Sequence, residues 1–269
     1  MPETTRLAGK LISMAVLCTL AWANTAVAEP SVRSIELGMS LEEAAKNLSG
    51  KGYEVEISPA TFDAAPGASV PYRLSATVNQ DTLVIHTDLN PAEPRVASVL
   101  RRRQSDASYQ SPAFSVFQGA LEKRNESEPQ FAFETQPSES RPAITHILGY
   151  EWNKSGKAQK TKKQGQRKDS LPLCLQATRD SIAKLDTTDS GIHEPSSDYR
   201  LDEAHQFTTE KVGTFSAGCN RNMFVSATVD PTAQTLTSFY LILMDHEMIK
   251  RGLAKLQPWL KAKREGSNP

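Results

Sequence analysis

The clearest pattern near the start of the chain is an apolar stripe with helical spacing. The residues that share this face are Leu41, Ala44, Ala45 and Leu48. Ser40 precedes the stripe and Glu43 follows Ser40 by three residues, which is the spacing of a capping box. Gly50 and Gly52 come directly after the stripe and are typical of a helix end. The pattern therefore predicts a helix that begins after Ser40.

The spacing then changes from helical to alternating, which predicts a run of strands at residues 53–57, 72–78, 83–89 and 96–101. In the second strand, Leu74 and Ala76 alternate with Arg73 and Ser75. Such alternation is typical of a sheet with one buried face and one face in water. Residues 59–71 lack this pattern and are expected to form a polar loop.

A second round begins at Ser111, a helix-capping residue followed by Pro112. Phe114, Phe117 and Leu121 lie on one stripe of the helix expected there. Further strands are expected at residues 130–134, 144–152, 171–178, 223–229 and 236–244. The last helix is expected to begin after Asp245 and to turn Ile249, Leu253, Leu256 and Leu260 toward the core, with an end left open by Pro258.

This order of elements predicts an α+β fold with helices packed on antiparallel sheets. It also raises the hypothesis of two related halves, each a helix followed by a meander. The halves would cover residues 29–108 and 109–269, and the second would hold two polar insertions at residues 156–169 and 186–209.

The first 28 residues have the pattern of a signal peptide. Arg6 and Lys10 precede an apolar run at residues 11–23, and Ala26 and Ala28 provide small residues at a cleavage site. A helix over that run would be about 20 Å long, short of the ~30 Å hydrocarbon core. We therefore expect cleavage near Ala28, a periplasmic or secreted product, and no transmembrane anchor in the mature form.

Composition adds two restrictions. With 38% hydrophobic residues the chain has enough apolar material for a packed core, which argues against wholesale disorder. The 31 basic and 31 acidic residues cancel, so the bulk charge does not indicate a nucleic-acid partner, and none is expected.

Cleavage would remove Cys18 and leave Cys174 and Cys219 as the two cysteines of the mature chain. In an oxidising compartment these thiols are expected to form a disulfide. The bond would close a loop of about 45 residues, which contributes about 4 kcal/mol to the free energy of unfolding in the chain-entropy description. The wide spacing lacks the C-x-x-C pattern of redox-active pairs, so a structural role is expected.

The stretch from Ile35 through the Gly38-Met39-Ser40 turn to Leu48 and the Gly52-Tyr53 pair resembles the opening of certain bacterial envelope proteins. These are outer-membrane assembly lipoproteins of the SmpA/OmlA type and proteins of the β-lactamase-inhibitor-protein-like fold. The resemblance covers about 20 residues and implies an α+β fold that presents a sheet face to a protein partner without catalysing a reaction. Unlike the lipoproteins, this chain has no lipid-attachment motif at Cys18.

Local motifs do not point to a catalytic site. His246-Glu247 begins like the zinc-peptidase helix, but Lys250 occupies the position of the second histidine ligand. The Gly213–Gly218 stretch has one residue too many for a nucleophile elbow, and Ser181 with Lys184 lacks the partner motifs of serine-lysine enzymes. The acidic, histidine-bearing stretch between Asp186 and His205 lacks the order of an EF-hand, so no metal or cofactor is expected.

One stretch of the second half carries only positive charge. Its members are Lys154, Lys157, Lys160, Lys162, Lys163, Arg167 and Lys168. Lys157, Lys160, Lys162, Lys163 and Arg167 are candidate contacts for a polyanion, and Arg101, Arg102 and Arg103 are candidates to extend the same surface. The alternative is a solvated loop between two strands.

These observations together favour an exported, non-enzymatic protein-binding module of the inhibitor or immunity type, whose partner is another envelope protein. One alternative is an envelope hydrolase with dispersed catalytic residues, for which Ser216, Asp245 and His246 are the candidates. The other is a polyanion-binding protein that uses the basic loop.

Overall fold

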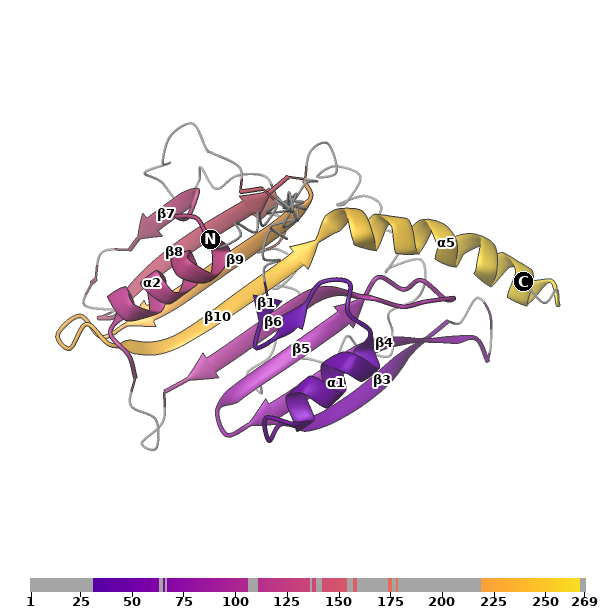
Figure 1. The fold of residues 1–269 in the computed structure, drawn as a ribbon, viewed down its shortest axis with the longest axis horizontal. Helices are drawn as coiled ribbons and strands as arrows, with labels where there is room; N and C mark the ends of the chain where they lie inside the picture. The colour runs from indigo at the N-terminus through magenta and orange to yellow at the C-terminus, as the bar shows by residue number, and fades with distance from the viewer. Residues whose placement is uncertain are drawn as a thin grey trace, which may run out of the picture.

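The computed structural model describes residues 31–62, 65, 67–105, 111–135, 137–138, 142–153, 157–158, 174–175, 178 and 219–266. Most of the described strands belong to one eight-stranded antiparallel sheet, and a two-stranded hairpin precedes it (Figure 1). With helices packed on this sheet, the predicted α+β class is confirmed.

The first half consists of a hairpin, a helix and a meander. The hairpin strands are β1 (Ser31–Val32) and β2 (Ile35–Glu36), and the helix is α1 (Leu41–Ser49). The meander follows as β3 (Glu54–Thr61), β4 (Ser69–Val78), β5 (Asp81–Thr87) and β6 (Val96–Gln104).

The second half repeats this order of helix and four strands. Helix α2 (Phe114–Asn125) precedes β7 (Phe131–Glu134), β8 (Ile144–Trp152), β9 (Arg221–Val229) and β10 (Leu236–Asp245). Helix α5 (His246–Arg264) is the last described element. Within the sheet the order is β3-β4-β5-β6-β10-β9-β8-β7, so the last strands of the two meanders pair at its centre. The predicted boundary near residue 108 falls between β6 and α2, and the division into two related halves stays a prediction.

Helices α1 and α2 cover the same face of this sheet, hereafter the helix face (Figure 1). Leu41, Ala44 and Leu48 of α1 are buried there against alternate strand residues, as the stripe predicted. The helix starts where expected, because the Ser40 hydroxyl accepts from the Glu43 amide at 3.1 Å. Leu121 of α2 completes the same cluster over the second meander.

The opposite face, hereafter the disulfide face, is also covered at its centre. Leu175 packs there against Val84, Leu100, Phe224 and Ile242. The prediction of one fully wet face is therefore wrong for part of the sheet, and Arg73, expected in water, is only 8% exposed.

Helix α5 continues from β10 past the end of the sheet (Figure 1). Leu253, Leu256 and Leu260 are buried against Phe62, Val70 and neighbouring residues, forming a third cluster. A Cβ built on Gly252 would lie 1.7 Å from the Asp88 carbonyl oxygen, so the close approach of this helix requires glycine. Pro258 lies inside the helix rather than ending it.

Three expectations about local structure were wrong. The loop expected at residues 59–71 is shorter, because β3 extends to Thr61 and β4 begins at Ser69. Helix α2 begins at Phe114 instead of after Ser111, because Ala113 bridges to Thr235 and is held beside the β9–β10 turn. In the strand expected at residues 171–178, the described residues Cys174, Leu175 and Thr178 are helical.

Candidate functional site

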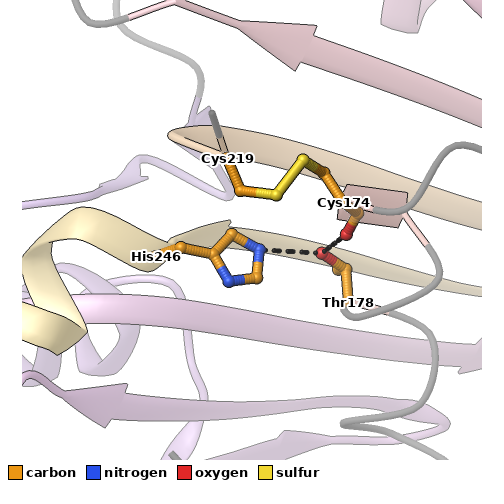
Figure 2. The surroundings of a disulfide bond; sticks show 4 residues. All are labelled: Cys174, Thr178, Cys219 and His246. Carbon is orange, nitrogen blue, oxygen red and sulfur yellow. Dashed lines mark hydrogen bonds between the residues drawn. A yellow bond between two sulfur atoms is a disulfide. The ribbon is translucent and has the colours of Figure 1, made fainter. Parts of the chain in front are cut away.

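The predicted disulfide is present in the structure and joins Cys174 to Cys219 (Figure 2). The Cα atoms are 5.5 Å apart, and Cys219 lies two residues before β9 and is 3% exposed. Leu175, directly after Cys174, is fully buried over Gly149 of β8, where an added Cβ would lie 2.1 Å from the leucine Cδ1. The bond therefore fastens a short helical segment onto the disulfide face.

Thr178 links this segment to the start of α5. Its hydroxyl donates to the Cys174 carbonyl at 2.9 Å and lies 3.2 Å from Nε2 of His246 (Figure 2). A threonine hydroxyl can donate one hydrogen bond, and here it donates that bond to the carbonyl of Cys174. The hydrogen-bond pattern therefore assigns the proton of His246 to Nε2, which donates to Thr178.

His246 is only 3% exposed, and burial lowers its pKa to about 4, with the charge of Asp245 offsetting part of the effect. The ring is therefore neutral at neutral pH. Because Nε2 already donates to Thr178, this nitrogen has no lone pair to accept a proton from a nucleophile.

The carboxylate of Asp245 accepts two structural hydrogen bonds. One carboxylate oxygen accepts from the Met248 amide at 2.9 Å and caps α5, as the sequence predicted. The other accepts from Nε of Arg221 at 3.0 Å. Of the three hydrolase candidates, the two described ones thus serve structural contacts, and Ser216 lies outside the described residues.

A second polar site lies on the helix face and centres on Asp81, whose side chain is 2% exposed. Oδ2 accepts from Arg33 at 2.9 Å, from Arg101 at 2.7 Å and from Arg103 at 3.4 Å. The Tyr53 hydroxyl donates to the same oxygen at 2.8 Å, and Nε of Arg101 donates to Oδ1 at 2.8 Å. We call Arg33, Arg101 and Arg103, gathered on this carboxylate, the arginine cluster.

Strand register explains why the arginine cluster forms. Asp81 begins β5 and stands directly opposite Arg103 of β6, while Leu83 stands opposite Arg101. Residues two apart on one strand share a face, so both arginines reach the carboxylate. Arg101 also lies over the Phe239 ring, at 5.0 Å from its centroid, which fixes the guanidinium from the neighbouring strand β10.

Arg33 comes from the turn between β1 and β2, where both central residues have left-handed backbone angles. Arg33 has φ 56° and Ser34 has φ 67°, positions that glycine or asparagine usually occupies. Each such residue costs on the order of 1 kcal/mol and persists only where surrounding contacts hold it. Here the bond from the Arg33 side chain to Asp81 is one such contact.

Two further cations bond to this hairpin, and we call them the rim cations. Lys51, after α1, donates from Nζ to the Arg33 carbonyl at 2.6 Å and to the Ser34 hydroxyl at 2.8 Å. Arg124, near the end of α2, donates to the Ser31 carbonyl at 3.1 Å. All these acceptors are uncharged, so neither bond neutralises a rim cation.

The directions of the pKa shifts of Lys51 and Arg124 agree with several positive charges lying close together. Burial lowers the pKa of Lys51 first, and the charges of Arg33 and Arg124 lower it further. The pKa of Arg124 is likewise lowered by burial and then by Arg101 and Arg33. For Asp81, burial alone would raise the pKa, but hydrogen bonding and charge from Arg101, with bonds from Tyr53 and Arg33, lower it below its usual value.

The basic loop is described only in part. Lys157 is exposed, and its main chain pairs with Asn153, whose side chain accepts from the Lys157 amide at 3.0 Å. Lys160, Lys162, Lys163 and Arg167 lie outside the described residues, as do the serine-lysine pair and the acidic stretch. In the chain that is described, no three metal-binding side chains come together.

The sequence suggested Arg101, Arg102 and Arg103 as candidates to extend the surface of the basic loop, and that suggestion stays a prediction. The structure pairs Arg101 and Arg103 with Asp81 instead. The sequence did not indicate Asp81, Tyr53, Arg33 or the rim cations. The signal available was the alternation of Arg101 and Arg103 at the end of a buried strand, where two inward arginines require a carboxylate. The partner itself is separated by about 20 residues and is found only through strand pairing.

Comparison with known proteins found no matching family model, no matching curated protein and no matching solved structure. None of the described helices is both long enough and apolar enough to cross a membrane.

Proposed function

We propose that this chain is an exported, non-enzymatic binding module that acts by contact with another envelope protein, in the manner of an inhibitor or immunity protein. The observation that carries this proposal is the structural use of Asp245 and His246. Both groups that a hydrolase would need for acid-base chemistry are buried in contacts that hold α5 and the disulfide segment.

Export is supported by the disulfide and by the leader-like residues 1–28. A single structural disulfide between distant cysteines is typical of proteins that fold in an oxidising compartment. The proposal predicts that the protein isolated from its host starts at Glu29 and contains no free thiol. Mass spectrometry of the intact protein, with and without reduction and alkylation, measures both properties.

Binding is supported by the cations at the β1–β2 turn, where the Arg33 side chain is 39% exposed and Lys51 is an exposed residue. Arginine is enriched at protein interfaces because its planar group makes several directed bonds with little loss of freedom. The test is cross-linking of the mature protein in envelope extracts, followed by purification of the captured partner and reconstitution of the complex. A saturable complex of fixed stoichiometry from the two purified proteins supports the proposal. Failure to reconstitute any complex at physiological concentration argues against it.

The hydrolase alternative has its own test. A panel of ester, peptide and glycan substrates is assayed with the wild-type protein and with Ser216→Ala and His246→Gln. Turnover that disappears in Ser216→Ala would replace the binding proposal with an enzymatic one.

The polyanion alternative rests on Lys157, Lys160, Lys162, Lys163 and Arg167. It predicts binding to an anionic polymer that weakens steeply with salt and disappears when Lys160, Lys162 and Lys163 are neutralised. Unchanged binding after that neutralisation would exclude the basic loop as its site.

A further inference from the structure

We propose that the solvent side of α5 binds peripherally to an anionic lipid surface. This inference goes beyond the proposed protein-binding function and does not depend on it. The exposed residues of that side are hereafter the basic face of α5, and they are Lys250, Arg251, Ala254, Lys255, Pro258 and Lys261.

Charge is distributed unevenly between this helix and the rest of the chain. The whole chain has 31 basic and 31 acidic residues, whereas α5 carries six lysine or arginine residues and one acid, Glu247. All six cations belong to exposed residues. Within the described chain, none of them forms an ion pair with a carboxylate. The helix therefore presents positive charge to solvent that no ion pair neutralises.

The stability of the helix does not explain its first cations. A positive charge in the last turn is favourable in any helix because of the macrodipole, which accounts for Lys261, Lys263 and Arg264. Arg251 and Lys255 lie far from that turn and are four residues apart, where two like charges repel each other. An anionic surface that compensates this repulsion gives the arrangement a physical reason.

The apolar side of α5 is already used within the fold. Leu253, Leu256 and Leu260 are buried against residues that include Phe62 and Val70, at the place where α5 continues past the end of the sheet (Figure 1). Only the basic face of α5 is therefore left for contact with a bilayer. Such contact is limited to the headgroup region, where lysine and arginine are attracted to anionic lipids.

A lipid surface fits the basic face better than a protein partner does. Four of the six cations of α5 are lysines, and lysine is depleted at protein interfaces, where arginine is enriched. A lysine ammonium is a strongly hydrated point charge that needs no planar partner, which suits a layer of mobile headgroups. Ala254 and Pro258 are exposed at helical spacing from Lys250, and their small side chains let the helix approach such a layer.

Trp259 lies one helical turn after Lys255 and one turn before Lys263. It is partly exposed, and the Lys263 ammonium lies 5.6 Å from the centroid of its ring. Tryptophan is enriched at the boundary between lipid and water because its ring is apolar and its nitrogen donates a hydrogen bond. Of the other two tryptophans, Trp22 lies in the expected leader and Trp152 is 3% exposed. In the mature protein, Trp259 is therefore the tryptophan that reports the approach of α5 to a membrane.

The test uses the mature protein in its oxidised form and vesicles made of equal parts of phosphatidylcholine and phosphatidylglycerol. Vesicles of pure phosphatidylcholine are the neutral comparison. Binding is measured by co-sedimentation, and by quenching of tryptophan fluorescence with a lipid that is spin-labelled at its headgroup. We expect binding to the anionic vesicles alone, with quenching of Trp259. Binding should weaken as salt is added, because salt screens the attraction between exposed charges.

The informative variant is Lys250→Gln with Lys255→Gln, because both side chains are exposed and glutamine keeps a similar helix propensity. Lys46→Gln with Lys123→Gln is the matched control, since it removes the same charge from exposed positions of α1 and α2. A lysine close to an anionic surface strengthens binding about fivefold. We therefore expect the α5 pair to weaken vesicle binding at least about tenfold and the control pair to weaken it less than about twofold.

A charge-conserving variant separates loss of charge from damage to the helix. Lys250→Arg with Lys255→Arg should bind anionic vesicles as the wild type does. Circular dichroism of every variant checks that the fold is kept. A loss of binding in this arginine pair equal to that in the glutamine pair would overturn the inference, because the positive charge would then not be the property that matters.

Four other results would also overturn the inference. The first is equal binding to anionic and neutral vesicles, or binding to neither. The second is equal weakening by the control pair. The third is binding to anionic vesicles without quenching of Trp259, which would mean that another surface contacts the lipid. The fourth is tighter binding to double-stranded DNA or to polyglutamate than to the vesicles at the same salt, which would assign the basic face to nucleic acid or to an acidic protein. None of these outcomes depends on whether a protein partner exists.

Discussion

Asp81→Asn should destabilise the protein by about 3 kcal/mol at neutral pH, through loss of a buried charge that three arginines share. The Oδ2 atom accepts from Arg33, Arg101 and Tyr53 at 2.7–2.9 Å, and an amide nitrogen in that place would face these donors. Breaking a buried ion pair typically costs about 3–5 kcal/mol. The arginine side chains are 14% to 39% exposed, so water compensates part of the loss and the lower end applies.

The assay is equilibrium unfolding in guanidinium chloride with the disulfide intact, followed by fluorescence and circular dichroism. Tyr53→Phe removes one neutral donor and should cost about 1 kcal/mol. Glu93→Gln is the matched control, because Glu93 is a 65% exposed carboxylate paired with Arg95 and should contribute less than about 0.5 kcal/mol. Stability of Asp81→Asn within about 1 kcal/mol of wild type would refute the reasoning.

The same carboxylate also predicts a pH dependence. Its folded pKa lies below the usual value, so the unfolded state takes up a proton first as the pH falls. The stabilisation from Asp81 should therefore be complete at neutral pH and disappear on the acid side of about pH 4. In Asp81→Asn this contribution to acid sensitivity should be missing.

Three further changes test other parts of the fold. Gly252→Ala should lower the melting temperature because the new methyl group would clash with the Asp88 carbonyl. Gly119→Ala, in open space on α2, should instead raise the free energy of unfolding by about 0.5–1 kcal/mol. Equal effects of the two substitutions in calorimetry would contradict the packing of α5. Reduction of Cys174–Cys219, or Cys174→Ala with Cys219→Ala, should remove about 4 kcal/mol of unfolding free energy, and an unchanged denaturation midpoint would show that the bond contributes little. His86 and His246 both have folded pKa values of about 4 because of burial, so the unfolded state binds more protons than the folded state. The free energy of unfolding should therefore decrease as the pH is lowered from about 6.5 to about 4, by up to about 1.4 kcal/mol per pH unit for each histidine. A flat stability profile over that range would refute their burial as neutral rings.

Elements governed by local chemistry were predictable from the sequence. Ser40 caps α1 and Asp245 caps α5 because a side-chain oxygen satisfies an amide three residues away, and such a motif is visible without knowledge of the fold. The strand at residues 144–152 matches β8, since its apolar run has clear polar flanks. The pairing of Cys174 with Cys219 followed from their number and the expected compartment.

Features that depend on distant contacts were not predictable. The late start of α2 follows from a bridge between Ala113 and Thr235. Arg73 is buried although the alternation along β4 predicted that its side chain lies in water. The site around Asp81 requires the register of β5 against β6 and the position of the β1–β2 turn. Neither the register nor the turn has a periodic signal in the sequence, because both are set by side chains far apart along the chain.

The pairing of β6 with β10 has a consequence for biosynthesis. A nascent chain makes β3 to β6 first, and the outer edge of β6 stays open until β10, the last strand, emerges. That edge belongs to a strand whose residues Val99 and Leu100 are buried in the finished molecule, and an apolar strand with free backbone groups is prone to aggregate. We therefore expect truncated chains that stop before Leu236 to depend on holdase chaperones and to be degraded, even though they contain a complete first meander.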